Sequence, residues 1–215
     1  MINKEKIAEL RREFDAAPLI VDELPNNPHV LFDTWFSQIL EAKLDDPTAC
    51  VLATVDAQGR PDTRVVLLKD FSNEQLIFYT NYHSQKALQM QASPWVALNF
   101  YWPSLFRQVR IRGCVKKISS TASEEYFYSR PRDSQISAYA SCQSTVTTRE
   151  NLAADFQKYQ QKFEAATIIP YPNHWGGYCI EPTEFEFWHG RNHRLHDRVE
   201  YLKSDNSWIK QTLAP

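Results

Sequence analysis

The sequence predicts a mainly antiparallel β protein with helical additions, arranged as one domain over residues 1–215. Two observations lead to this fold class. Short apolar segments with strand character recur between residues 50 and 118 and again after residue 175, mostly joined by short turns as in hairpins. Helical patterns fall mainly in an N-terminal segment, residues 1–45, and in an insertion, residues 120–165. Six to eight strands of this kind favour one antiparallel barrel with helical additions.

Composition narrows the class of protein further. The chain has 215 residues, 43% of them hydrophobic, which suits a folded domain with a sizeable core. The formal net charge is −2, so nucleic acid is not an expected partner. No run of 18 apolar residues predicts a membrane span, and the polar N-terminus lacks the apolar core of a signal peptide. The four cysteines have no paired spacing, so we expect reduced, mostly buried thiols in a cytoplasmic protein.

The first elements are expected to be two helices. Residues 3–15 carry Ile7, Leu10 and Phe14 at helical spacing. Asn27 is a suitable cap for a second helix that starts at Pro28 and runs to about Leu44. Its expected apolar face is Leu31, Trp35 and Ile39, with Phe36 and Leu40 as further candidates.

The central region then changes to strand periodicity. Residues 50–55 and 63–69, separated by the turn at residues 56–59, predict a hairpin. Further strands are expected at residues 75–80, 95–102 and 106–118, with a short helix at residues 84–91 between the first two. In the last of these strands, Val109, Ile111 and Val115 should share the buried face, and Gln108, Arg110 and Arg112 the other.

The second half is expected to hold the helical insertion and the closing strands. Thr121 with Glu124 predicts a capping box for a helix that ends at Pro131, and residues 133–139 predict another helix. Thr147 with Glu150 predicts the cap of a third helix that reaches about Phe163. Strands are expected at residues 175–180, 183–188, 194–202 and 208–211.

The stretch from Phe185 to Arg198 is the most promising functional segment. If residues 194–202 form a strand, Arg194, His196 and Arg198 project from one face, because successive side chains alternate. Three neighbouring cation-capable groups repel one another unless an anion or an electron-rich ring lies opposite. A solvated edge strand is the simpler explanation, but the flanking aromatics favour a half-buried binding site whose cavity all three residues border.

Three other groups could bind anions. Arg64 and Lys69 lie at the two ends of one apolar strand, where simple snorkelling also explains them. Residues 79–80 and 84–86 form a strand-to-helix junction with hydroxyls and a lysine. Such a junction can bind a phosphate, but many helices start in this way. Residues Tyr126, Arg130 and Ser134 recur every four positions and could hold a phosphate, although Arg130 could equally pair with Glu125 or Asp133. We expect no metal, because His193 and His196 have no further ligands at suitable spacing. The five glycines do not form a glycine-rich phosphate-binding motif.

These segments together resemble the pyridoxine 5'-phosphate oxidase family of flavin enzymes. The resemblance runs from Arg11-Arg12-Glu13-Phe14 to the C-terminal Leu213-Ala214-Pro215. It is most specific in residues 185–198, 128–136 and 64–69. It implies an FMN-binding split β-barrel and a homodimer, with each FMN site at the subunit interface. It also implies oxidation of pyridoxine or pyridoxamine 5'-phosphate by O2 to pyridoxal 5'-phosphate, with release of H2O2, and of ammonia from the amine.

The resemblance also implies roles for individual residues. Arg64, Lys86 and Ser144 would hold the FMN phosphate, while Arg198 would approach the polar edge of the flavin. Arg194 and His196 would be the catalytic residues. The implied cofactor-binding residues are Arg64, Val65, Val66, Leu67, Leu68, Lys69, Tyr79, Thr80, Gln85, Lys86, Gln108, Gln143, Ser144, Trp188 and Arg198. The implied substrate-binding residues are Arg11, Arg12, Glu13, Phe14, Lys69, Tyr126, Arg130, Ser134, Arg194, Leu195 and His196.

Two positions depart from the family pattern, and two other functions stay open. Gln85 stands where the family commonly has Arg, so FMN is expected to be held less tightly or another cation to substitute. Phe14 stands where Tyr is usual, which removes a hydroxyl from a possible lid. One alternative is a split-barrel reductase that uses a nicotinamide donor. Another is a non-catalytic carrier of flavin or pyridoxal phosphate. The intact set of predicted substrate-phosphate residues argues against the reductase.

Overall fold

The computed structural model describes residues 13–14, 16–72 and 74–215. The predicted helix over residues 3–15 therefore lies outside the described residues, except for Glu13 and Phe14, which are not helical. The described chain divides into two compact units. Unit 1 comprises the residues up to 47, residues 98–111 and residues 183–215, and unit 2 comprises residues 48–97 and 112–182.

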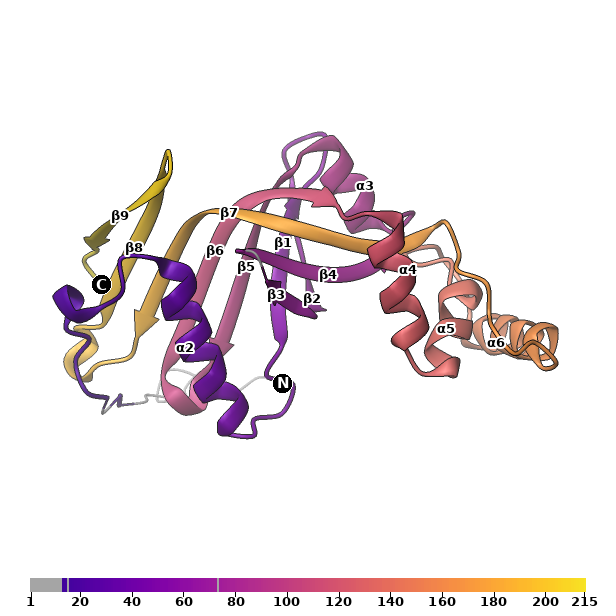
Figure 1. Ribbon diagram of the computed structural model, residues 1–215, viewed down its shortest axis with the longest axis horizontal. Coiled ribbons are helices and arrows are strands. Elements are labelled where there is room, and N and C mark those ends of the chain that lie inside the picture. The colour runs from indigo at the N-terminus through magenta and orange to yellow at the C-terminus, as the bar shows by residue number, and fades with distance from the viewer. Residues whose placement is uncertain (1–12, 15, 73) are drawn as a thin grey trace, which may run out of the picture. The chain divides into compact units, whose positions relative to one another are not determined.

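Antiparallel strands dominate the described part of the chain, as predicted (Figure 1). Nine strands are hydrogen-bonded in the order β2-β1-β5-β6-β7-β4-β3, with β8 pairing with β7 and β9 with β8. The strands are β1 (Ala49–Val55), β2 (Pro61–Leu67), β3 (Asp70–Ser72), β4 (Gln75–Asn81), β5 (Trp95–Trp102), β6 (Arg107–Lys117), β7 (Trp175–His189), β8 (Asp197–Ser204) and β9 (Ser207–Thr212). The helices are α2 (Pro28–Glu41), α3 (Gln85–Ala92), α4 (Ser120–Ser129), α5 (Arg132–Ala140) and α6 (Arg149–Phe163), with 3-10 turns η1 (Val21–Glu23), η2 (Pro103–Leu105) and η3 (Asn192–Arg194).

Unit 1 packs α2 against aromatic side chains of the sheet. Asn27 caps α2 by accepting a hydrogen bond from the His29 backbone N–H, as predicted. Leu31, Trp35 and Ile39 are buried, so the predicted apolar face is confirmed, whereas Leu40 is half exposed. Edge-to-face contacts join Trp35 to Phe187 and Phe187 to Tyr201. These contacts fix the end of β7 from which the predicted functional stretch continues.

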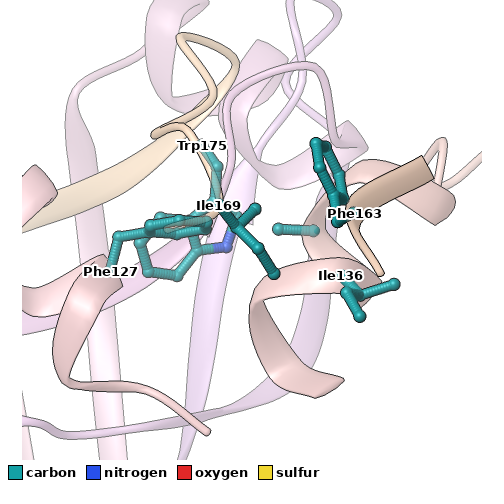
Figure 2. Close-up of a cluster of buried hydrophobic side chains, with 6 residues drawn as sticks. Phe127, Ile136, Phe163, Ile169 and Trp175 are labelled. Carbon is teal, nitrogen blue, oxygen red and sulfur yellow. The ribbon is translucent and has the colours of Figure 1, made fainter. Parts of the chain in front are cut away.

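Unit 2 holds a separate cluster that anchors the helical insertion (Figure 2). Phe127 on α4, Ile136 on α5 and Phe163 on α6 are buried together with Ile169 and Trp175. Trp175, the first residue of β7, therefore belongs to the same buried cluster as residues of all three helices of the insertion, and its ring contacts Phe127 of α4. Because Trp175 also faces a cavity described below, this cluster ties the insertion to that cavity.

Several predicted boundaries are wrong for identifiable reasons. The caps of α4 and α6 are Ser119 and Thr148, whose side chains accept hydrogen bonds from the backbone N–H three residues later, and not Thr121 and Thr147. The strands predicted at residues 175–180 and 183–188 are one strand, β7, which continues through Pro182. Strand β3 was not predicted at all, because three residues are too short to show a period.

The most important correction concerns the strand predicted to begin at Arg194. Strand β8 begins at Asp197, and Asn192–Arg194 form the 3-10 turn η3. His193 and Arg194 both have positive φ angles, 57° and 60°, so the backbone coils here instead of alternating. The argument that Arg194 shares a face with His196 and Arg198 is therefore wrong, because it required an extended strand.

Candidate functional site

A cavity of about 430 Å³ in unit 2, called the basic cavity below, collects many of the predicted residues. Its lining combines cations, hydroxyl groups, amides and aromatic rings. It is lined by Val65, Val66, Leu67, Lys69, Tyr79, Thr80, Asn81, Lys86, Tyr126, Arg130, Ser137, Ala138, Ser141, Gln143 and Trp175. Ten of these residues belong to the predicted cofactor or substrate sets.

Lys86 provides one cationic end of the basic cavity. Ser84 caps α3 by accepting a hydrogen bond from the Ala87 backbone N–H, which places Lys86 in the first turn of that helix. The Lys86 Nζ atom donates to the Thr80 hydroxyl at 3.3 Å and to the Gln143 amide oxygen at 3.0 Å. Burial, with a smaller effect from Arg64, lowers the pKa of Lys86. An anion bound here would therefore stabilise the charged form of Lys86.

The loop that carries Ser144 reaches the start of α3. The Ser144 hydroxyl accepts a hydrogen bond from the Gln85 backbone N–H at 3.1 Å, and Ser144 has a positive φ of 73°. The Gln85 side chain itself is exposed. Gln85, Lys86, Gln143 and Ser144, far apart in sequence, are thus brought together as predicted.

Arg64 lies near Lys86 but is held by its own network. Its Nη1 atom donates to the Thr54 hydroxyl at 2.5 Å, and its Nη2 atom donates to Asp62 at 2.7 Å and to the Gln89 amide oxygen at 3.0 Å. Gln89 is buried and also donates to Asp62. These contacts fix the guanidinium, which is itself not part of the cavity lining. The strand ends at Leu67, so Lys69 is free of strict alternation and does line the cavity.

Arg130 provides the second cationic end, beside a stack of rings. Tyr79 stacks on Tyr126 with ring centroids 3.7 Å apart and on Trp175 at 5.4 Å, and the Arg130 guanidinium carbon lies 4.4 Å from the Trp175 ring centre. The Arg130 Nη1 atom is buried and has no hydrogen-bond partner among the described residues. Burial lowers the pKa of Arg130. A half-buried guanidinium whose buried Nη1 donor is unused is a strong candidate for binding an anion.

The predicted partners of Arg130 are found only in part. Tyr126 lines the basic cavity with Arg130, as expected. Helix α4 ends at Ser129, so the four-residue period does not continue, and Ser134 is not in the lining. Ser137 and Ser141 on and after α5 supply hydroxyls instead. Arg130 forms no ion pair with Glu125 or Asp133, which were the alternative partners.

A second, smaller cavity in unit 1 collects the end of the predicted functional stretch. It has a volume of about 270 Å³ and contains Leu195, His196, Asp197 and Arg198 in its lining. The remaining lining residues are Val21, Thr212, Leu213, Ala214 and Pro215. His196 and Arg198 therefore do border one cavity, while Arg194 is exposed outside its lining.

Arg198 is held by a buried carboxylate. The Glu186 Oε1 atom accepts a hydrogen bond from the Arg198 Nε atom at 2.9 Å and forms an ion pair with the Arg198 Nη2 atom at 2.9 Å. Its Oε2 atom accepts a hydrogen bond from Arg110 at 2.7 Å. The Arg198 Nη1 atom donates to the Ala214 carbonyl at 2.7 Å. Trp188 lies directly opposite Arg198 in the pairing of β7 with β8. Glu186 thus orients Arg198, a role that the sequence alone did not reveal.

Phe14 packs against His196 and against two further aromatic side chains. Its ring makes edge-to-face contacts with Phe106, Trp188 and His196 at centroid distances of 5.3 to 5.7 Å. A Cβ atom at Gly190 would lie 2.6 Å from the Phe14 ring, so only glycine allows this close approach.

The chain that follows Phe14 is tied to the same loop. The Arg191 side chain donates to the Ala16 carbonyl, and Asp197 accepts a hydrogen bond from the Leu19 backbone N–H. Residues near Phe14 are therefore fastened to the loop before β8 at two points.

The remaining predicted residues differ in how they are placed. Gln108 is half-buried on β6, and Val65 and Leu67 are exposed apolar side chains on β2. Arg11 and Arg12 lie outside the described residues. Trp175 and Glu186 were not predicted, although each stands in an apolar strand where an unusually large ring or an isolated acid is a signal.

Metals, membranes and cysteines can be treated briefly. Among the described residues, no group of three His, Cys, Asp or Glu side chains is placed to hold a metal ion. None of the described helices is long and apolar enough to cross a membrane. Cys50 and Cys179 are buried, Cys114 is half-buried and Cys142 is exposed, all as free thiols. Burial raises the pKa of Cys50 to about 12.

The chemistry of the basic cavity suits an anion attached to a flat ring. Lys69, Lys86 and Arg130 supply positive charge, and nearby hydroxyls and amides supply hydrogen bonds. Val65, 64% exposed, and Leu67, 40% exposed, offer apolar surface beside these groups. Exposed apolar side chains next to a cationic cavity are typical of a site whose ligand has both a phosphate and an aromatic part.

Two protein-family models match this chain. A family model described as pyridoxamine 5'-phosphate oxidase matches residues 36–168. A second model, described as the pyridoxine 5'-phosphate oxidase C-terminal dimerisation region, matches residues 175–215.

Individual proteins match over nearly the full length. The chain is 47% identical over 210 residues to a pyridoxine/pyridoxamine 5'-phosphate oxidase of Legionella pneumophila (strain Paris), covering 97% of both chains. It is 44% identical over 212 residues to one from Escherichia fergusonii, covering 98% of this chain and 97% of the relative.

Solved structures agree in fold. PhzG from Burkholderia lata 383, in complex with tetrahydrophenazine-1-carboxylic acid, has a TM-score of 0.87 at 27% identity, covering 95% of this chain and all of that one. A pyridoxamine 5'-phosphate oxidase-related, FMN binding protein of Nostoc punctiforme has a TM-score of 0.71 at 20% identity, covering 89% of this chain and all of that one. The predicted split-barrel fold class is confirmed by these neighbours.

Proposed function

This chain belongs to the pyridoxamine 5'-phosphate oxidase family, and on that premise we propose that it oxidises pyridoxine 5'-phosphate and pyridoxamine 5'-phosphate to pyridoxal 5'-phosphate. The observation that carries the proposal is the 47% identity, over 97% of both chains, to a relative named for this activity. We further propose a cytoplasmic location, which is supported by four cysteines without paired spacing.

The residues present fit FMN as the cofactor. Lys86 is hydrogen-bonded to Gln143, Ser144 is hydrogen-bonded to the Gln85 backbone, and Arg64 lies near enough to lower the pKa of Lys86. Together they supply the cations and hydrogen-bond donors that a phosphate monoester needs. The exposed side chain of Val65 and its neighbour Leu67 supply apolar surface for a flat ring. When bound, FMN would supply the redox chemistry, as the carrier of two electrons between the substrate and O2.

The substrate phosphate is assigned to the other cationic end of the basic cavity. Arg130 offers a buried, unused Nη1 donor, while Lys69 and Tyr126 line the same cavity. A phosphate dianion would satisfy that donor and offset the burial that lowers the pKa of Arg130. The phosphate thus anchors the substrate in the ground state, and the reacting carbon is positioned by this anchor. Ser134 stays a proposed partner that would have to turn toward the cavity.

Arg194 and His196 are proposed to contact the substrate ring and its C4′ substituent. Arg194 is exposed and carries a permanent charge, so it can orient the ring and stabilise a developing negative charge. For pyridoxamine 5'-phosphate, loss of the hydride and a proton gives an imine, which water hydrolyses to the aldehyde and ammonia. Trp188, Gln108 and Arg198 are proposed to border the flavin.

The family match to a dimerisation region over residues 175–215 supports a homodimer. We propose that residues of both subunits complete each FMN site. Light scattering or sedimentation should give twice the chain mass of 25.1 kDa at assay concentrations. A monomer that is fully active would contradict this proposal.

Anaerobic reduction tests the function in one step. The purified, FMN-loaded protein should lose its flavin absorbance when pyridoxine 5'-phosphate or pyridoxamine 5'-phosphate is added without oxygen. Admission of air should restore the absorbance and yield one H2O2 per aldehyde. Protein that cannot bind FMN would contradict the whole assignment. Bleaching by a nicotinamide donor, but by neither B6 phosphate, would instead identify a reductase.

A further inference from the structure

His196 has one ring nitrogen whose role the backbone determines. The Arg191 backbone N–H donates a hydrogen bond to the His196 Nδ1 atom at 3.0 Å. A backbone N–H can only donate, so Nδ1 must present a lone pair and cannot carry a proton. In a neutral imidazole the proton then lies on the other nitrogen, Nε2.

The imidazole ring is held firmly in this orientation. The rings of Phe14 and His196 form a T-shaped contact at a centroid distance of 5.3 Å, and the Trp188 ring lies 4.8 Å from the imidazole. Arg191 is itself anchored, because its side chain donates to the Ala16 carbonyl at 2.9 Å. Rotating the ring would therefore cost both the aromatic contacts and the hydrogen bond to Nδ1.

The charges around His196 also favour its neutral form. Burial and the neighbouring Arg194 lower the pKa of His196, while Asp197 opposes them with a smaller effect. Asp197 is shared with other groups: it accepts from the Leu19 backbone N–H and lies 4.0 Å from the Arg191 Nε atom. Among the described residues, no side chain accepts a hydrogen bond from His196 Nε2, so this donor is available to a ligand.

From this geometry we propose that His196 acts in the reaction as a neutral hydrogen-bond donor through Nε2–H, and that it is not the base that removes the substrate proton. A base must offer a lone pair, and the only lone pair on this ring faces the Arg191 backbone N–H. The ligand group that meets Nε2 must therefore be an acceptor, such as an oxygen substituent of the substrate ring. Arg191 is then the residue that sets the tautomer of His196. It rests on the proposed function for the identity of the ligand but not for the tautomer.

The tautomer can be measured without any turnover. In FMN-loaded protein labelled with 15N-histidine, ring nitrogen shifts and their couplings to the two ring C–H protons distinguish Nδ1 from Nε2 and protonated from unprotonated nitrogen. The His196 signals are those missing from the spectrum of His196→Gln. We expect a protonated Nε2 and an unprotonated Nδ1 at neutral pH. A proton on Nδ1, with Nε2 bare, would overturn the proposal even if the oxidase activity is present.

A matched pair of variants then tests the role in turnover. The Gln side chain places an N–H donor close to the position of Nε2, whereas Asn reaches only to the position of Nδ1, and neither is a base. His196→Gln should keep kcat/KM within about fivefold of the wild type, while His196→Asn should lose about 10- to 100-fold, the value of one donor to a charged acceptor. Equal losses of about 10²–10⁴-fold in both variants, as expected for a missing general base, would contradict the proposal.

The two experiments separate this inference from the proposed function. If neither B6 phosphate reduces the flavin of the wild-type protein, the function is wrong, while the NMR result still decides the tautomer. Bound FMN and normal melting in both variants exclude misfolding as the cause of a lost rate. If His196→Asn raises KM but leaves kcat unchanged, a role of His196 in the reacting complex would also be overturned.

Discussion

Replacing Glu186 with Leu should destabilise the protein more than replacing any single exposed acid. Glu186 is 5% exposed and accepts hydrogen bonds from two arginines, Arg110 and Arg198. The substitution removes the carboxylate and leaves both guanidinium groups without their partner. Breaking a buried ion pair in this way costs about 3–5 kcal/mol.

The expected loss lies at the lower end of that range. The Arg110 side chain is 46% exposed and that of Arg198 is 25% exposed, so water can hydrate both after the change. The remaining Arg198 bond to the Ala214 carbonyl also persists. We therefore expect a loss of about 3 kcal/mol in the free energy of unfolding. For a chain of this size this corresponds to a melting temperature lower by about 6–12 °C.

Urea unfolding at one protein concentration and saturating FMN measures this loss. The matched control is Glu181→Leu, because the ion pair of Glu181 with Lys116 is about half exposed and should contribute no more than about 1 kcal/mol. Glu186→Gln, which keeps one acceptor oxygen, should fall between the two. If Glu186→Leu unfolds within about 1 kcal/mol of Glu181→Leu, then Glu186 does not hold the two arginines as described.

Three further predictions concern other contacts. Arg130→Lys should raise KM for the phosphorylated substrates about 10- to 100-fold while FMN affinity is unchanged, because lysine lacks the planar fork that stacks on Trp175; equal loss of FMN in titrations would contradict the assignment. The FMN phosphate that we propose at Lys86 needs the charged form of this lysine, so FMN affinity should weaken as pH rises through the lowered pKa of Lys86. Lys86→Arg should flatten that dependence in titrations between about pH 7 and 11, and an identical profile for both proteins would refute the assignment. Gly190→Ala should cost about 1–3 kcal/mol in thermal unfolding, and adding Phe14→Ala should relieve that cost; an unchanged melting temperature for the single variant would mean that Phe14 is not packed there.

Periodicity predicted the elements well where an element is long and amphipathic. Helix α2 and strand β6 were located with the correct buried faces, because their apolar residues recur over three or more turns or pairs. Caps were placed one or two residues too late or too early, since several Ser and Thr residues near each helix start could fill the same role. Pro182 did not divide β7, although proline usually marks a break.

The candidate site shows a sharper limit. Sequence spacing placed Arg194 on a strand, whereas a 3-10 turn with two positive φ angles occupies that position. The residues Asn192–Arg194 do not predict this turn, because the two residues with positive φ, His193 and Arg194, are not glycines. Likewise, the residues that hold Arg64 and Arg198 in place, Gln89 and Glu186, come from other elements. Such contacts depend on tertiary pairing that local pattern does not encode.

The uneven exposure of the four thiols has a practical consequence. Cys142 is the exposed cysteine and immediately precedes Gln143, which lines the basic cavity. Cys50 and Cys179 are shielded, and burial raises the pKa of each thiol, so electrophilic reagents should modify them slowly. A fluorophore or spin label attached at Cys142 would therefore lie next in sequence to a residue that lines the basic cavity, so that its signal can follow loading of the cavity in real time.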